Sequence, residues 1–114
     1  MNRRNLVAAA TSAVALAAAF SMPAWAQSNV IKVAHIYGKT GALEAYAKQT
    51  QVGLMMGLDY ATGGTMMVNG KKIEIIEKDD QGKPDLGKSL LAAAYSDDKA
   101  DLAIGTTGSG VALA

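Results

Sequence analysis

Segments typical of strands alternate with segments typical of helices along most of this chain, and that alternation constrains the fold more than any other feature. Residues 30–37 (VIKVAHIY) are apolar and β-branched with little interruption and end at a glycine, which favours a strand buried on both faces. From residue 43 to about 61 apolar side chains recur every three or four positions, which predicts an amphipathic helix closed by the glycines that follow Thr62. Gly53 and Gly57 lie on one stripe of this helix, and we expect them to let it approach the sheet closely.

A second strand and a second helix follow. Asn69-Gly70 separates residues 66–68 from the strand-like run 71–78 (KKIEIIEK), and this dipeptide in that setting predicts a β-hairpin. Pro84 suits a first helical position, which tolerates the missing N–H group, and we expect the helix to end at residues 96–98. The predicted buried stripe of this helix consists of Leu86, Leu90, Leu91, Ala93 and Ala94.

The remaining residues complete the pattern. Residues 101–105 (DLAIG) predict a short third strand, residues 106–110 a loop, and residues 111–114 the opening of a third helix. Alternation at this spacing predicts βαβ units with parallel strands, so the expected fold class is α/β with a Rossmann-like parallel sheet. The third strand would be an open edge, and the roughly eighty-eight residues after the first twenty-six are near the lower limit for an independent domain. We therefore expect the chain to be truncated and residues 27–114 to form part of a larger domain.

The first 26 residues have the order of a secretory signal peptide. Arg3 and Arg4 supply positive charge, residues 6–20 form an uncharged, alanine-rich core, and Ala24-Trp25-Ala26 places small residues where a signal peptidase reads them. Cleavage is predicted after Ala26. The alternative is a membrane-anchoring helix, which the short core and the weak hydrophobicity of alanine disfavour. The mature protein is therefore expected in the periplasm, without direct membrane insertion, and the choice between the general and the twin-arginine export routes stays open.

Composition excludes several classes of function. The chain has no cysteine, so it forms no disulfide, thiolate metal site or lipid-anchored cysteine. Without Arg3 and Arg4, nine lysines face ten acidic residues and no basic cluster remains, so neither nucleic acid nor an anionic membrane is an expected partner. Export also disfavours enzymes that depend on ATP or nicotinamide cofactors, and no cofactor is predicted.

The residues around the first strand do not predict catalysis. Gly38-Lys39-Thr40 lies between a strand and a helix, but a phosphate loop needs another glycine five residues earlier, where this chain has Val33. His35 is the single histidine, and its apolar strand favours a partnered core residue over a ligand or a base. No GxSxG motif is present. We therefore predict no catalytic residue and no enzymatic activity.

Asp79-Asp80 at the end of the second long strand is a weak candidate for a metal site. Two adjacent acids offer too few oxygen ligands, and Lys78 and Lys83 oppose a cation. The favoured interpretation is a solvated strand end that caps the next helix, and no metal is predicted.

The loop at residues 105–110 (GTTGSG) is the best candidate site. Small residues at the carboxyl end of a strand leave backbone N–H groups free, and a following helix directs its positive end towards them. Such a loop can receive a carboxylate or a phosphate, with the Thr107 and Ser109 hydroxyls as further donors, at the edge where open α/β sheets bind ligands. Tyr46 lies on the same rim and either lines a pocket or packs in the core. The alternative for the loop is a plain tight connection.

Four segments taken together resemble a known family. The leader, the run VIKVAHIYGKTGALEAYA, the arm VNGKKIEIIEKDD and the loop DLAIGTTGSG are similar to the N-terminal part of a type I periplasmic substrate-binding protein from the branched-chain amino acid ABC importer group. The resemblance covers all of residues 27–114, but only the first part of lobe one of such a protein.

The resemblance implies a fold of two Rossmann-like lobes that close on a small solute. It implies that Ser109 holds the ligand carboxylate, that Tyr46 lines the cleft and that Thr107 and Gly108 contact the ligand from the same loop. Glycines on both sides of Ser109, and Ala42 where many members have proline, depart from the pattern of amino acid binders. The solute therefore stays open among branched-chain or related amino acids, aromatic acids and amides.

The expected function is that of a solute receptor. It binds a small carboxylate ligand between two lobes and delivers it to the membrane subunits of an ABC permease, and ligand contacts made only in the closed state drive hinge closure. Three alternatives remain: a sensing lobe of a membrane signalling receptor, an exported α/β hydrolase whose motifs this stretch lacks, and a truncated fragment without ligand affinity.

Overall fold

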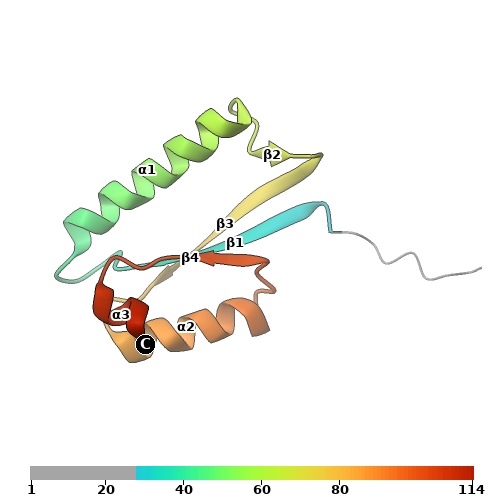
Figure 1. Cartoon of the computed structure of the whole chain (residues 1–114). Coiled ribbons are helices and arrows are strands. Elements are labelled where there is room, and N and C mark those ends of the chain that lie inside the picture. Colours follow the sequence, from blue (N-terminus) through green and yellow to red (C-terminus); the bar gives the residue numbers. More distant parts are fainter. Residues whose placement is uncertain (1–27) are drawn as a thin grey trace, which may run out of the picture.

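A computed structural model describes residues 28–114, which form one four-stranded sheet flanked by helices (Figure 1). The predicted leader lies outside the described residues. The strands are adjacent in the order β2-β3-β1-β4. In chain order the elements are β1 (Val30–Tyr37), α1 (Glu44–Thr62), β2 (Met67–Val68), β3 (Lys71–Asp79), α2 (Pro84–Ser96), β4 (Leu102–Ile104) and α3 (Ser109–Leu113). This order confirms the predicted α/β class and every predicted strand and helix.

The sheet is parallel except for its hairpin edge. β1 pairs with β3 along its whole length, from Val30 opposite Lys72 to Tyr37 opposite Asp79, and pairs with β4 on its other side. β2 is antiparallel to β3. Asn69 and Gly70 both have positive φ angles, 49° and 75°, as the tight turn between β2 and β3 requires. The predicted hairpin is confirmed.

The ends of the two long helices follow their sequence signals. α1 ends at Gly63, which is left-handed, and the amides of Gly63 and Gly64 return to the carbonyls of Tyr60 (3.3 Å) and Asp59 (2.8 Å). Pro84 is the first residue of α2, as predicted. The predicted start of α3 at residue 111 is two residues too late, since the helix begins at Ser109.

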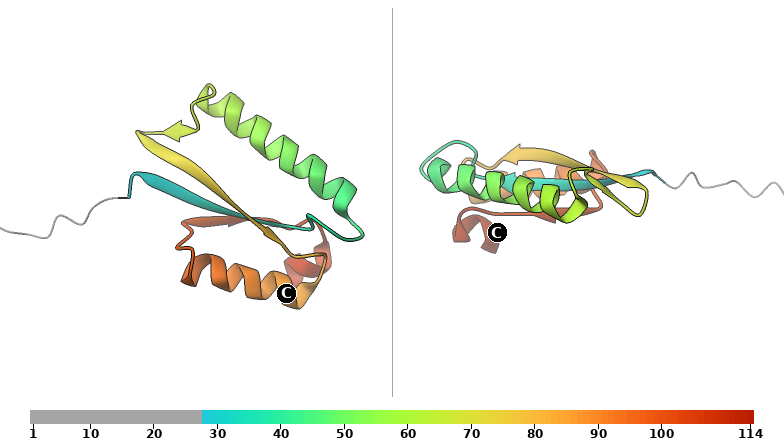
Figure 2. Two further views of the ribbon diagram at one scale, coloured as in Figure 1. Left: turned by 180° about the vertical axis from the view of Figure 1, so that it is seen from behind. Right: turned by 90° about the horizontal axis from the view of Figure 1, so that it is seen from above.

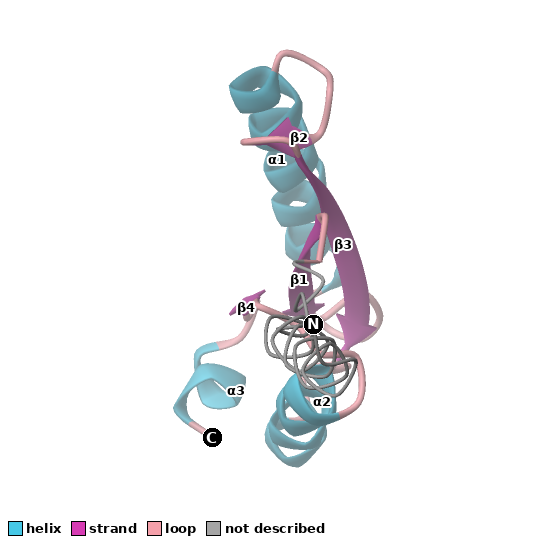
Figure 3. Cartoon of the chain, turned by 90° about the vertical axis from the view of Figure 1, so that its right-hand side faces the viewer, coloured by secondary structure: helices cyan, strands magenta, loops and turns pink. Residues whose placement is uncertain are grey.

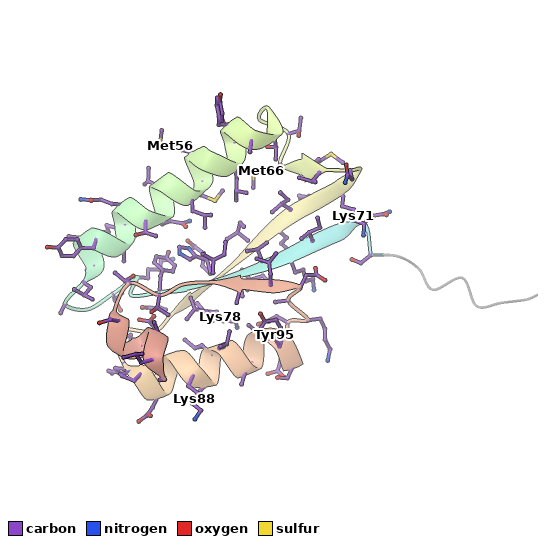
Figure 4. The ribbon with its side chains drawn as sticks, in the orientation of Figure 1. Met56, Met66, Lys71, Lys78, Lys88 and Tyr95 are labelled. Atoms are coloured by element: carbon purple, nitrogen blue, oxygen red, sulfur yellow. The ribbon has the colours of Figure 1, made fainter. Side chains whose placement is uncertain are left out.

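The two long helices cover opposite faces of the sheet (Figures 1 and 2). Neighbouring residues of a strand point to opposite faces. On β1, His35 bonds to Gln51 of α1, whereas Ala34 belongs to a buried cluster with Ala94 of α2 and Ala100. Figure 4 shows Met56 and Lys88 on the outer sides of α1 and α2, away from the sheet. The sheet is therefore the middle layer of three.

Three expectations about packing are wrong. A side chain added at Gly53 or Gly57 would meet nothing within 4 Å, so these glycines are not where α1 approaches the sheet. The close glycine contacts lie elsewhere: Gly87 of α2 against Val111 of α3, and Gly105 against the backbone of Ile36. Figure 3 shows α2 and α3 side by side. Leu91, predicted to be buried, is 41% exposed. The solvated strand end predicted at Asp79-Asp80 is corrected below.

β4 is the open edge that the sequence predicts. Leu102 and Ile104 are 43% and 38% exposed, and a cavity of about 250 Å³ with largely apolar walls lies between this strand, α2 and α3. Among residues 28–114, no helix is long and apolar enough to cross a membrane.

Candidate ligand-binding site

The loops after β1, β3 and β4 meet at one edge of the sheet, because the three strands are parallel and end on the same side. The Gly38 amide donates to the Thr107 hydroxyl oxygen at 3.1 Å, which joins the first loop to the third. A side chain added at Gly41, whose φ is 102°, would stand 3.0 Å from the Gln81 carbonyl oxygen, so the first and second loops also touch. This edge carries most of the residues nominated from the sequence.

Ser109 is the first residue of α3 and is exposed. Within residues 28–114 neither its hydroxyl nor its amide has a hydrogen-bond partner, whereas the amides of Val111 and Ala112 both return to the Gly108 carbonyl. Gly108 precedes the helix in extended conformation and gives no side-chain cap. The edge therefore presents a free hydroxyl and a free amide on one residue, which suits an anionic oxygen atom.

The hydroxyl groups of the two threonines in the loop after β4 make hydrogen bonds that stabilise the loop itself. The Thr106 hydroxyl donates to the Gly108 carbonyl at 2.8 Å, and the Thr107 hydroxyl accepts the Gly38 amide proton. Both threonines are half-buried. Thr107 is thus close to Ser109 along the chain, but one of its acceptor sites is already used.

Tyr46 is 66% exposed, so it does not pack in the core. It lies in the first turn of α1 and has no hydrogen bond to the loop after β4. The nearest link is Leu43, whose Cδ1 would stand 3.4 Å from a side-chain carbon added at Gly108. The structure therefore brings the start of α1 beside the loop and leaves the Tyr46 side chain exposed.

The acidic pair does not cap α2, and the expectation of a solvated end is wrong for Asp80. Asp79 binds the first loop: its carboxylate accepts the Thr40 amide (3.1 Å), the Thr40 hydroxyl (2.6 Å) and the Gln81 amide (3.0 Å). Burial alone raises the pKa of Asp79, but these hydrogen bonds outweigh it and hold the pKa below its ordinary value. Asp80 is only 1% exposed. The residue before α2 is Lys83, which makes no side-chain cap.

His35 is the buried, partnered core residue that the sequence predicts. It is 1% exposed, stacks on Tyr37 with ring centres 4.1 Å apart, and its Nδ1 lies 3.0 Å from the Gln51 amide oxygen. Burial lowers the pKa of His35, and the bond to Gln51 and the charge of Glu77 oppose this only in part. The ring is therefore neutral near pH 7. In residues 28–114 no three side chains of the kinds that bind metals are grouped.

The structure contains one polar network that the sequence patterns do not predict. The Tyr37 hydroxyl donates to Glu77 Oε1 at 2.7 Å, and Lys39 Nζ lies 3.3 Å from Glu77 Oε2. Burial and the bond to Glu77 raise the pKa of Tyr37 to about 12, and the same bond is the chief cause that lowers the pKa of Glu77. Only the register between β1 and β3 brings these residues together, and local sequence patterns carry no signal for it.

Comparisons with known proteins agree with this architecture. The family model described as periplasmic binding protein matches residues 30–114. A structure of an ABC-type branched-chain amino acid transporter from Rhodopseudomonas palustris is 67% identical, with a TM-score of 0.72 over 73% of this chain and 22% of the other. A solute-binding protein of an ABC transporter from the same species, in complex with 3,4-dihydroxybenzoic acid, is 32% identical, with a TM-score of 0.60 over 67% of this chain and 20% of the other.

A third structure shares the fold. It is the substrate-binding protein of a branched-chain amino acid transporter from Streptococcus pneumoniae in complex with isoleucine, 24% identical, with a TM-score of 0.66 over 73% of this chain and 24% of the other. No curated protein matches the chain. The chain thus spans between a fifth and a quarter of the length of these relatives. With this fold and this family match, the chain belongs to the periplasmic binding protein family, and residues 30–114 correspond to the N-terminal part of the first lobe in its branched-chain amino acid ABC transporter group.

Proposed function

We propose that the protein is the extracytoplasmic solute-binding component of an ABC importer. It binds a small carboxylate ligand in a cleft between two lobes and delivers it to the permease, and it catalyses no reaction. Family membership supports this role, as do relatives whose structures contain isoleucine and 3,4-dihydroxybenzoic acid. Both compounds carry a carboxylate, so the ligand class comprises branched-chain or related amino acids and aromatic acids.

The observation that carries the proposal is the unpartnered Ser109 at the carboxyl edge of the sheet. Its hydroxyl and amide donate to the ligand carboxylate, since hydrogen bonds to an ionised acceptor are the strong ones. Gly108 and Thr107 border the carboxylate through their backbone, and the free ring of Tyr46 covers the organic part of the ligand from α1. Contacts with the second lobe form only on closure and therefore favour the closed state.

The predicted leader, which directs export to the periplasm, belongs to the same proposal. The intact mass of the protein from its host should correspond to a chain that begins at Gln27. A mass that retains residues 1–26 would contradict cleavage after Ala26.

Calorimetric titration tests the binding role. The full-length protein, as its host makes it, is titrated with isoleucine, leucine, benzoate and 3,4-dihydroxybenzoate in parallel. We expect saturable one-to-one binding of at least one of the four. Absence of binding heat and of any ligand-dependent rise in melting temperature with all four would contradict the proposed ligand class.

A further inference from the structure

Three residues from the loops at the candidate edge form a polar junction, which we call the loop junction: Gly38, Asp80 and Thr107. Each residue comes from a different loop, after β1, β3 and β4. The Gly38 amide donates to the Thr107 hydroxyl. Because glycine has no side chain, an open space lies next to the Gly38 Cα atom. A carbon placed there would have three nearest atoms: Asp80 Oδ1 at 3.6 Å, the Gly82 amide nitrogen at 3.8 Å and Thr107 Oγ1 at 3.8 Å. All three loops therefore meet around one point.

Asp80 has an acceptor that is not satisfied. Its Oδ1 takes the Gly82 amide at 2.7 Å, while its Oδ2 is buried and has no hydrogen-bond partner among residues 28–114. Burying a carboxylate oxygen without a hydrogen-bond partner destabilises the folded state. The bond to the Gly82 amide needs only one of the two carboxylate oxygens, so it does not account for the second. The carboxylate is thus placed to receive a second donor.

The donor that borders the same gap is the Thr107 hydroxyl. The Gly82 amide already donates its proton to Asp80 Oδ1, so it is not available to the second oxygen. The Thr107 oxygen accepts from Gly38, which leaves its own proton free, and no acceptor for that proton is present in the described part of the chain. Thr107 and Asp80 therefore border the same gap at Gly38, and each has one hydrogen-bonding site unused within residues 28–114.

We propose that Asp80 and Thr107 are coupled positioning residues that fix the loop after β4, so that Ser109, two residues beyond Thr107, meets the ligand. Thr107 then acts from beneath the ligand through its side chain, in addition to the backbone contact inferred from the family. This inference rests on the proposed function, because it assigns the placement of the same binding loop.

The test compares four variants of the full-length protein: Thr107→Val, Thr107→Ser, Asp80→Asn and the double variant Asp80→Asn/Thr107→Val. Each is titrated by calorimetry with isoleucine and with 3,4-dihydroxybenzoate. Removing the hydroxyl in Thr107→Val should raise Kd roughly tenfold, and Asp80→Asn should do the same. Thr107→Ser keeps the hydroxyl and should stay within about twofold of the wild type. The double variant should be no weaker than the weaker single variant, because both changes break one unit.

Thr62→Val is the matched control. The Thr62 hydroxyl is also half-buried and also accepts a backbone amide, that of Met66 at 3.0 Å, but it lies at the end of α1 remote from the site. This variant should melt at a lower temperature with an unchanged Kd. Effects of Asp80→Asn and Thr107→Val that simply multiply, or a serine variant as weak as the valine variant, would overturn the coupling.

Amide hydrogen exchange separates this inference from the proposed function. In the ligand-free protein the Gly38 amide should lose protection in Thr107→Val and keep it in Thr107→Ser. If the wild type binds neither isoleucine nor 3,4-dihydroxybenzoate, the Gly38 exchange rate still decides whether the junction exists, and the proposed ligand class fails only if leucine and benzoate do not bind either. Unchanged protection of Gly38 in Thr107→Val would overturn the inference whatever the ligand result.

Discussion

At the scale of single residues, the loop after β4 divides its hydroxyl groups between two tasks. Thr106 and Thr107 hold the loop, through bonds to Gly108 and from Gly38, while the Ser109 hydroxyl and amide have no hydrogen-bond partner within residues 28–114. The Ser109 hydroxyl is exposed, unpartnered and next to a free amide at the start of a helix. A ligand can therefore bind to it without breaking a hydrogen bond of the folded protein. This division fits the proposed function, in which one serine between two glycines binds the ligand carboxylate without further hydroxyl residues.

Ser109→Ala should therefore weaken ligand binding with little effect on stability. Loss of a hydrogen bond to an ionised acceptor is worth about 1.5–3 kcal/mol, so Kd measured by calorimetry should rise roughly ten- to a hundredfold. Ser89→Ala is the control, since Ser89 is an exposed α2 serine whose hydroxyl bonds only within its helix, to the Asp85 carbonyl. An unchanged Kd in Ser109→Ala would remove Ser109 from the site.

Tyr37→Phe tests the network on the α1 face of the sheet. The change removes the hydroxyl that donates to Glu77, and we expect a loss of about 1 kcal/mol in the free energy of unfolding at pH 7. The folded state lowers the pKa of Glu77 below its ordinary value of 4.5, so this stabilisation is present above pH 4.5 and is lost as the pH falls through the lowered pKa.

The variant should consequently differ most from the wild type at neutral pH and converge with it in acid. Chemical denaturation at a series of pH values measures this difference. Tyr60→Phe is the control, because Tyr60 is 90% exposed and its hydroxyl has no partner among residues 28–114. A stability difference that stays constant down to pH 3 would show that Glu77 is not the group responsible.

At the scale of secondary-structure elements, local patterns predicted which elements form but not how closely they pack. The runs at residues 30–37 and 71–78, the Asn69-Gly70 turn and Pro84 carry their signals within a few residues, and all four match the structure. Whether a glycine marks a close approach depends on the element across from it. Gly53 and Gly57 face open space, whereas Gly87 faces Val111 from a helix more than twenty residues away.

The candidate site was predictable to the same extent. Ser109 and Tyr46 could be nominated from the family pattern, and the structure leaves both exposed, Ser109 at the carboxyl edge of the sheet and Tyr46 in the first turn of α1. The burial of Asp80 and the contact of Glu77 with Tyr37 could not be predicted, because both depend on the pairing of β1 with β3 and on the turn that follows. The surroundings of a side chain at this edge depend on all three loops, those after β1, β3 and β4, and not on its own sequence neighbours alone.

Two glycine substitutions should have opposite effects for this reason. Gly87→Ala adds a methyl group against Val111 where α2 and α3 are in contact, and overpacking there should destabilise the protein by about 1–3 kcal/mol. Gly53→Ala adds the same group within α1 where nothing lies within 4 Å, and the better helix propensity of alanine should stabilise by up to about 1 kcal/mol. Denaturant midpoints of the two variants measure both effects. Equal changes of one sign would contradict the packing of α2 against α3.

At the scale of the whole molecule, the two edges of the sheet differ in kind. One edge is the two-residue strand β2, which is too short to offer much backbone to a partner. The other is β4, with Leu102 and Ile104 exposed beside the cavity between α2 and α3. The relatives of the same family are roughly three times as long as this chain, so an edge of this kind has further protein available to cover it.

Residues 27–114 produced alone should therefore associate and bind no ligand. The exposed β4 edge and its apolar neighbours favour pairing between chains, and a single partial lobe cannot close on a solute. We expect broad elution above the monomer mass in size-exclusion chromatography and no cooperative melting. Ile104→Lys places a charge on the edge and should shift the population towards the monomer, whereas Lys88→Arg, on the outer side of α2, should not. A compact monomer of the unsubstituted fragment with a sharp melting transition would mean that the four-stranded sheet and the two long helices bury enough surface to fold without covering that edge.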